Sequence, residues 1–191
     1  MCGRYSFEAN KKELIERYQL KESAYDYEEK EEIYPTNVSP IILPDAQLVL
    51  LTWGFSPSFA KRPLINARGE TVLEKPTFSK AFKTKRCLVP ATSFFEWEKM
   101  DGHKEKREIS VKNQFIFSMA GICDTFLDKN GKEALMYSII TTEANEQMKS
   151  IHDRMPVILT PENEADYLNL NHAPEEVQQL LRPFDQELVI V

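Results

Sequence analysis

The sequence is poor in cysteine and has no long apolar run, and each of these features excludes a class of protein. Only three of its 191 residues are cysteines, Cys2, Cys87 and Cys123. They form no Cys-x-x-Cys pair, which argues against a disulfide framework or a structural zinc site and fits a reducing compartment. No apolar run approaches the ~18 residues of a membrane span, and the polar start lacks the hydrophobic region of a secretory signal. We therefore expect a cytoplasmic protein that has no membrane anchor and needs no metal or cofactor.

Nothing in the chain divides it into parts: there is no linker rich in Pro, Gly or Ser, no internal repeat and no low-complexity segment. With 42% hydrophobic residues, residues 1–191 are expected to form a single domain with a sizeable core. Residue patterns and turn dipeptides predict hairpin turns at Asp101-Gly102 and Asn130-Gly131. The expected strands are 47–55, 86–98, 114–126, 134–141, 156–159 and 188–191. The expected helices are 10–20, with an Asn10/Glu13 capping box, 143–150, one starting at Thr160-Pro161, and 175–181. This order predicts an α+β fold with a mostly antiparallel, barrel-like sheet and peripheral helices.

The net charge of −6 does not favour nucleic acid as a partner, but the charge is unevenly distributed. Residues 61–112 hold 13 Lys and Arg against 7 Asp and Glu, a local charge of +6, whereas residues 1–60 and 113–191 carry −4 and −8. The middle third is therefore the candidate anion-binding face. In it, Lys104 and Lys106 are equally well explained as residues that solvate a hairpin turn. A more suggestive cluster leads into an apolar strand and comprises Lys80, Lys83, Lys85 and Arg86.

The second residue is the most unusual chemical feature. If Met1 is removed, Cys2 becomes the N-terminus and carries an amine and a thiol on adjacent carbons. The pKa of an α-amine is ~7.7–8.0, well below the ~10.4 of lysine. A fraction of the amine is therefore unprotonated at neutral pH and able to attack a carbonyl. Amine, thiol and aldehyde together give a five-membered thiazolidine ring. The alternative is that Cys2, like most cysteines, is a small buried hydrophobe.

Three further segments contain candidate polar residues. Asn66 and Arg68 combine an amide that donates and accepts with a guanidinium suited to a phosphate, although a turn asparagine and a surface arginine would look the same. Glu96 lies between aromatic residues, where desolvation raises a carboxyl pKa and suits it to acid–base catalysis, unless an arginine pairs with it. His152 lies just before an expected strand, and histidine is the side chain best able to exchange protons at neutral pH.

Taken together, these segments resemble the SOS response-associated peptidase family of abasic-site processing proteins. The resemblance covers about residues 1–160 in the family's order. It rests on Met1-Cys2-Gly3-Arg4, Trp53-Gly54-Phe55, Asn66-Ala67-Arg68-Gly69-Glu70-Thr71, Arg86-Cys87-Leu88-Val89-Pro90-Ala91, Phe95-Glu96-Trp97 and His152-Asp153-Arg154-Met155-Pro156.

The resemblance implies a function and a set of site residues. Cys2, exposed by a self-processing, peptidase-like removal of Met1 or by a separate aminopeptidase, would form a thiazolidine crosslink with abasic sites in single-stranded DNA. The crosslink would shield the lesion from cleavage, with possible reversal and weak lyase activity. The residues implied as catalytic are Cys2, Asn66, Glu96 and His152. Those implied to contact DNA are Arg4, Pro40, Phe59, Arg68 and Thr141.

The sequence departs from the family pattern at two DNA contacts. Phe59 stands where members often have tryptophan, so stacking there would use a smaller ring. Pro76 lies where some members have an arginine, and Lys75 or Lys80 would have to compensate.

Two other functions use part of the same residues. An N-terminal-cysteine amidohydrolase or peptidase would use Cys2 and an oxyanion donor such as Asn66 on a small amide, but would not need the basic segment. A non-covalent reader of modified bases would need a cleft and aromatic residues but not Cys2. We expect the protein to be a monomer.

Overall fold

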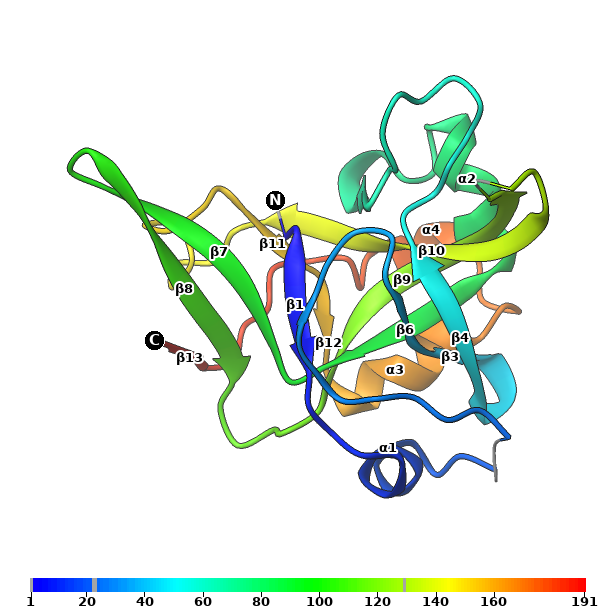
Figure 1. The fold of residues 1–191 in the computed structure, drawn as a ribbon, viewed down its shortest axis with the longest axis horizontal. Coiled ribbons are helices and arrows are strands. Elements are labelled where there is room, and N and C mark those ends of the chain that lie inside the picture. Colours follow the sequence, from blue (N-terminus) through cyan, green and yellow to red (C-terminus); the bar gives the residue numbers. More distant parts are fainter. Residues whose placement is uncertain (1, 22–23, 129) are drawn as a thin grey trace.

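The computed structural model describes residues 2–21, 24–128 and 130–191, and its strands form two sheets (Figure 1). The larger sheet closes into a barrel, because β10 pairs with β4 on one side and with β9 on the other. Every strand pairing is antiparallel except those of β10 with β4 and with β5. In order around the barrel the strands are β3 (Val38–Leu43), β4 (Gln47–Trp53), β10 (Glu133–Glu143), β9 (Phe117–Leu127) and β6 (Arg86–Ala91).

The second sheet has five strands and carries the N-terminal segment in its interior. Its order is β13 (Leu188–Ile190), β8 (His103–Val111), β7 (Ser93–Met100), β1 (Arg4–Phe7) and β2 (Lys30–Ile33). Three short strands join the barrel: β5 (Asn66–Arg68), β11 (Arg154–Pro156) and β12 (Ile158–Leu159). The helices are α1 (Lys11–Tyr18), η1 (Pro44–Ala46), η2 (Gly69–Thr71), α2 (Pro76–Thr84), α3 (Pro161–Leu168) and α4 (Pro174–Gln178). The predicted α+β fold with a mostly antiparallel barrel is confirmed.

Local signals in the sequence are realised as expected. The Asn10 side chain accepts from the backbone N–H of Glu13, and the Glu13 side chain accepts from that of Asn10, so the capping box begins α1. Gly102 and Gly131 have φ of +82° and +75° in the two predicted hairpin turns, a backbone region that glycine enters without steric cost. Cys87 and Cys123 are buried free thiols of the core.

Some element predictions were wrong. The expected strand 86–98 breaks at Thr92, because β6 belongs to the barrel and β7 to the second sheet. Residues 143–150 are not a helix: Glu143 ends β10, and the Asn145 side chain accepts from the Met148 N–H in a series of turns. The expected strand 156–159 splits into β11 and β12, and the last helix ends at Gln178.

No helix in the described part of the chain combines the length and apolar character needed to cross a bilayer.

Candidate functional site

Cys2 lies buried just before β1, at a point where two strand pairings bring other candidate residues to it. β1 runs antiparallel to β7 with Arg4 opposite Phe95, so Cys2 lies at the level of the Glu96–Trp97 step. β5 pairs with β10 and presents Asn66, whose Nδ2 donates to the Cys2 carbonyl oxygen at 3.0 Å. The Cys2 thiol donates to the Arg4 carbonyl at 3.5 Å. The first turn of the chain is thus fixed by backbone and amide contacts.

Glu96 and His152 meet beside this turn. Glu96, on β7, is only 3% exposed, and its Oε2 lies 4.0 Å from His152 Nε2 in the segment before β11. Arg107 lies opposite Glu96 on β8, yet its guanidinium bonds Glu98 and Glu105. Burial raises the pKa of the Glu96 carboxyl above its usual range, against the opposing influence of His152. A carboxyl in this state exchanges a proton closer to neutral pH than a solvated one does.

The thiol of Cys2 cannot ionise by itself near neutral pH. Burial, reinforced by the negative charge of Glu96, raises its pKa well above the ordinary value. A protonated thiol is a poor nucleophile, so attack by sulfur requires a neighbouring base. Glu96, whose negative charge acts on the thiol, is the candidate for that base.

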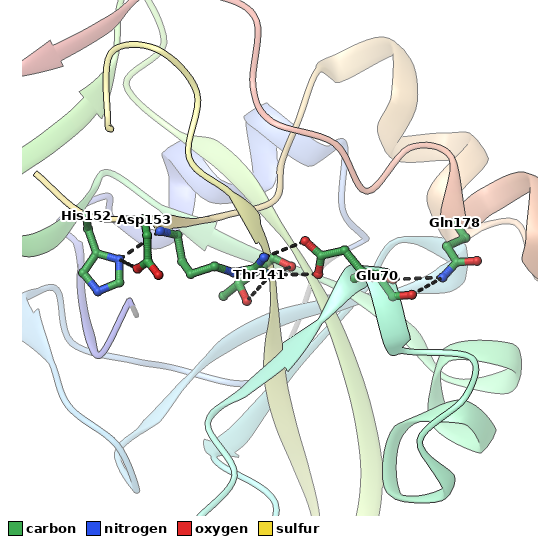
Figure 2. A network of polar contacts seen from close by, with 7 residues as sticks. Glu70, Thr141, His152, Asp153 and Gln178 are labelled. Atoms are coloured by element: carbon green, nitrogen blue, oxygen red, sulfur yellow. Dashed lines mark hydrogen bonds and ion pairs between the residues drawn. The ribbon is translucent and has the colours of Figure 1, made fainter. Parts of the chain in front are cut away.

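A polar network anchors His152 to the barrel (Figure 2). The Arg154 guanidinium donates from Nη1 and Nη2 to the Glu70 carboxylate at 2.6 and 2.9 Å. Its Nη2 also donates to the Thr141 carbonyl and hydroxyl oxygens at 2.9 and 3.2 Å. On the far side of Glu70, Gln178 of α4 donates to the Gly69 carbonyl at 2.9 Å. The bidentate pair fixes the position of Arg154 and hence of the segment that contains His152.

This network also orients the imidazole. The backbone N–H of Arg154 donates to His152 Nδ1 at 2.9 Å, so in the neutral ring the proton is on Nε2, the nitrogen that faces Glu96. Asp153 Oδ1 also lies 2.9 Å from Nδ1 and can accept from it when the ring is protonated. In both the neutral and the protonated ring, Nε2 therefore carries a proton that can be delivered beside Glu96.

A cleft of about 550 Å³ opens beside Glu96 and His152. Residues of β7, β8 and the segment before β11 line it: Glu96, Trp97, Lys99, Lys104, Lys149, Ser150, Ile151, His152 and Asp153. In the described ranges, no group of three or more His, Cys, Asp or Glu side chains is arranged to hold a metal ion. The cleft offers hydrogen-bonding and proton-transfer groups to a polar substrate.

The residues expected to contact DNA lie in different environments. Arg68 is exposed on β5, directly opposite Thr141, whose side chain is buried under Arg154. Phe59 is 72% exposed in the loop between β4 and β5. Arg4 is half-buried, with its guanidinium 3.0 Å from Glu32 and stacked over Tyr34 and Trp97. Pro40 is buried in β3 and lines a separate small cavity with Phe7 and Tyr27.

The predicted basic cluster at 80–86 does not form a continuous anion-binding face. Arg86 is fully buried and donates to three backbone carbonyls, and Lys85 bonds Asp124 at 2.7 Å. Only Lys80 and Lys83 of that cluster are exposed. Sequence reasoning also assigned no role to Arg154 or Glu70, although both are in the motifs that it quoted; Gln178 carried no sequence signal.

Glu96→Gln is expected to raise the melting temperature at pH 8 and to leave it nearly unchanged at pH 4. The folded state raises the carboxyl pKa, so the stability that this group contributes is full below its unfolded pKa of ~4.3 and is lost as pH rises through the folded value. Glutamine is neutral throughout and avoids that loss. Each kcal/mol corresponds to ~2–4 °C in a domain of this size, which thermal melts resolve.

Glu98→Gln is the matched control, because Glu98 lies on the same strand but bonds Arg107 at 2.7 Å. It should give no gain at pH 8. If Glu96→Gln lowered the melting temperature at pH 8, the buried carboxylate would be a net stabilising partner of His152.

Comparisons with known proteins agree with the family resemblance of the sequence. A family model described as SOS response associated peptidase (SRAP) matches residues 1–191. The abasic site processing protein YoqW of Bacillus subtilis is 37% identical over 199 residues, which cover 98% of this chain and 89% of that protein. The abasic site processing protein HMCES of Xenopus tropicalis is 30% identical over 167 residues, 72% of this chain and 50% of that protein. A crystal structure of a Bacteroides thetaiotaomicron protein superposes with a TM-score of 0.88 at 32% identity, covering 99% of this chain and 90% of that one.

Proposed function

The chain belongs to the SOS response associated peptidase family, and we propose that it processes abasic sites in single-stranded DNA by forming a covalent thiazolidine crosslink through Cys2. The observation that carries the proposal is the convergence of four residues. Asn66 bonds the Cys2 backbone, and the buried carboxyl of Glu96 lies 4.0 Å from His152 beside them. An N-terminal cysteine, a proton acceptor and a proton donor are the groups that this condensation needs.

The reaction begins with the sugar. An abasic deoxyribose is mostly a closed hemiacetal, and its aldehyde is released when an acid protonates the ring oxygen. His152 can do this through Nε2, the nitrogen that faces the reactive cluster. The Asn66 amide, held beside Cys2, is placed to bond the freed hydroxyl or the carbonyl.

Two bond-forming steps follow. The Cys2 amine adds to the aldehyde carbon, and loss of one water gives an imine. The thiol then adds to the imine carbon while its proton is transferred through Glu96 to the former amine nitrogen, which closes the ring. The raised thiol pKa makes this base necessary, and the raised Glu96 pKa suits it to both accept and return a proton.

Ring closure protects the strand. An open iminium acidifies the neighbouring carbon and invites β-elimination, which would cleave the DNA and appear as weak lyase activity. The thiazolidine removes that acidity, and the same two proton carriers allow reversal. The amine is available only after removal of Met1, a residue outside the described part of the chain. We propose that the protein acts as a monomer.

The test is adduct formation with a single-stranded oligonucleotide that contains one abasic site. The wild-type protein should give a heat-resistant adduct, and Cys2→Ala should give none, because its amine alone forms only a hydrolysable imine. Cys123→Ala is the matched control, since Cys123 is also a buried thiol but lies in the barrel. It should crosslink like the wild type.

Further controls separate the chemistry from general affinity. Borohydride reduction of the aldehyde, or retention of Met1, should abolish the adduct. An adduct that survives either treatment would rule out the thiazolidine. Cys2-dependent cleavage of a small amide without any adduct would favour the amidohydrolase alternative.

A further inference from the structure

The hairpin of β7 and β8 extends beyond the rest of the molecule (Figure 1), and its outer half carries two lysines in direct opposition. Lys99 and Lys104 are cross-strand partners, followed on the same face by the pair Trp97 and Lys106. Directly opposed like charges destabilise a strand pair. Their placement therefore calls for an explanation other than the stability of the hairpin.

Two other basic side chains of this hairpin are paired within the protein. Arg107 bonds Glu98 and Glu105, and Lys106 bonds Glu32 while lying over the Phe95 ring. By contrast, in the residues that the structure describes, Lys99 and Lys104 are exposed and form no hydrogen bond or ion pair. Two unpaired lysines side by side on one face of the hairpin attract an anion.

These lysines belong to the same cleft as the proposed proton carriers. Lys99 and Lys104 line the cleft of about 550 Å³ together with Glu96, His152 and Trp97. Next to it, the Arg4 guanidinium lies 4.9 Å from the centre of the Trp97 ring. Cations that follow a backbone, interleaved with an aromatic ring, are the combination that binds single-stranded nucleic acid without sequence preference.

We propose that Lys99 and Lys104 bind backbone phosphates of the DNA strand on one side of the abasic nucleotide, so that the hairpin of β7 and β8 holds one flank of the lesion as it enters the cleft. This inference rests on the proposed function, because it takes the lesion to lie at Glu96 and His152. It adds an element that none of the expected DNA contacts includes, which are Arg4, Pro40, Phe59, Arg68 and Thr141.

The test uses two single-stranded oligonucleotides that carry a tetrahydrofuran abasic analogue, which has no aldehyde and cannot crosslink. One has its nucleotides only on the 5′ side of the analogue and the other only on the 3′ side. The double variant Lys99→Gln/Lys104→Gln is compared with Lys12→Gln/Lys132→Gln. The control lysines are also exposed and lie in no ion pair in the described residues, but they are on α1 and on the β9–β10 turn.

The readout is the dependence of affinity on salt. Each phosphate contact on a single strand contributes ~0.7 to the slope of log binding constant against log salt concentration. The slope for the hairpin variant should therefore be shallower than that of the wild type by ~1.4 on one oligonucleotide and unchanged on the other. Between 50 and 200 mM salt, its affinity should then fall about sevenfold less than that of the wild type. The control variant should match the wild type on both.

Two outcomes would overturn the inference: wild-type slopes for the hairpin variant on both oligonucleotides, or an equal loss on both, which would indicate general attraction. The covalent chemistry is tested separately with a true abasic site. Wild-type protein that shows the hairpin-dependent slope but forms no adduct would overturn the proposed function and leave the flank assignment standing. Normal crosslinking together with unchanged slopes would overturn the flank assignment alone.

Discussion

Replacing Arg86 with methionine should destabilise the folded protein by about 3–5 kcal/mol. Arg86 is 0% exposed, and its three terminal groups donate to the carbonyls of Phe82, Tyr167 and Asn169 at 2.8, 2.5 and 2.7 Å. These carbonyls lie in the last turn of α2 and at the end of α3, where helices leave acceptors unpaired and carry partial negative charge. One guanidinium thus joins two helix ends to the start of β6.

The large effect follows from what methionine leaves behind. It fills a similar volume but donates no hydrogen bond, and each buried polar group left unsatisfied costs ~1–3 kcal/mol. Arg86→Lys keeps the charge but cannot reach all three carbonyls, so it should lie between methionine and wild type. It also provides a measurable variant if methionine prevents folding.

The measurement is urea unfolding of the three proteins together with Lys85→Met. Lys85 is the adjacent residue, but it is half-buried and bonds Asp124, so its loss should cost no more than ~1 kcal/mol. Equal unfolding midpoints for Arg86→Met and Lys85→Met would show that the three carbonyls find other partners.

The contrast between these neighbours shows where sequence reasoning reaches its limit. Elements encoded within a few residues were predictable: the Asn10 capping box and the Gly102 turn depend on contacts no more than three residues apart. Whether a basic side chain is buried or exposed was not predictable. Arg86 follows three lysines and looks like one more surface charge, yet its partners at Tyr167 and Asn169 lie more than 80 residues later in the chain.

The same limit explains the wrong strand and helix boundaries. Residues 86–98 are rich in apolar and aromatic residues and were predicted as one strand. The break at Thr92 depends on which neighbouring strands pair with each half. Residues 143–150 have helix-favouring composition, but β10 extends to Glu143 because it pairs with β11. Tertiary pairing overrides propensity in both cases.

The same limit applies to the candidate site. Cys2, Asn66, Glu96 and His152 could be selected from the sequence because each residue type carries its own chemistry, and the resemblance to a family tied them together. The contacts that hold His152 in place could not be predicted from the sequence. They consist of the Arg154–Glu70 pair and the Gln178 contact, which join segments up to 109 residues apart.

His152→Ala should slow adduct formation on closed-ring abasic sites by ~10²–10⁴-fold, the range typical of a general acid or base. The variant lacks the Nε2 proton donor beside Glu96, so opening of the hemiacetal must depend on water. The sharper prediction concerns an abasic analogue with an acyclic aldehyde, which needs no ring opening. On that substrate His152→Ala should react at nearly the wild-type rate. His172→Ala, which removes a histidine bonded to Asn169, is the control and should be normal on both substrates.

Glu96→Gln should fail at a different step, with a comparable loss of rate. Without the carboxylate, nothing takes the proton of a thiol whose pKa burial has raised, so the imine forms but the ring closes slowly. Cyanoborohydride, which reduces imines, should therefore increase the trapped product far more for Glu96→Gln than for wild type. It should give no such increase for His152→Ala on the closed sugar, because little imine forms there. Wild-type rates for both variants, with circular dichroism unchanged, would assign Glu96 and His152 a structural role. A deficit shared equally on cyclic and acyclic aldehydes would instead make His152 a positioning residue, since ring opening is the only step that distinguishes the two substrates.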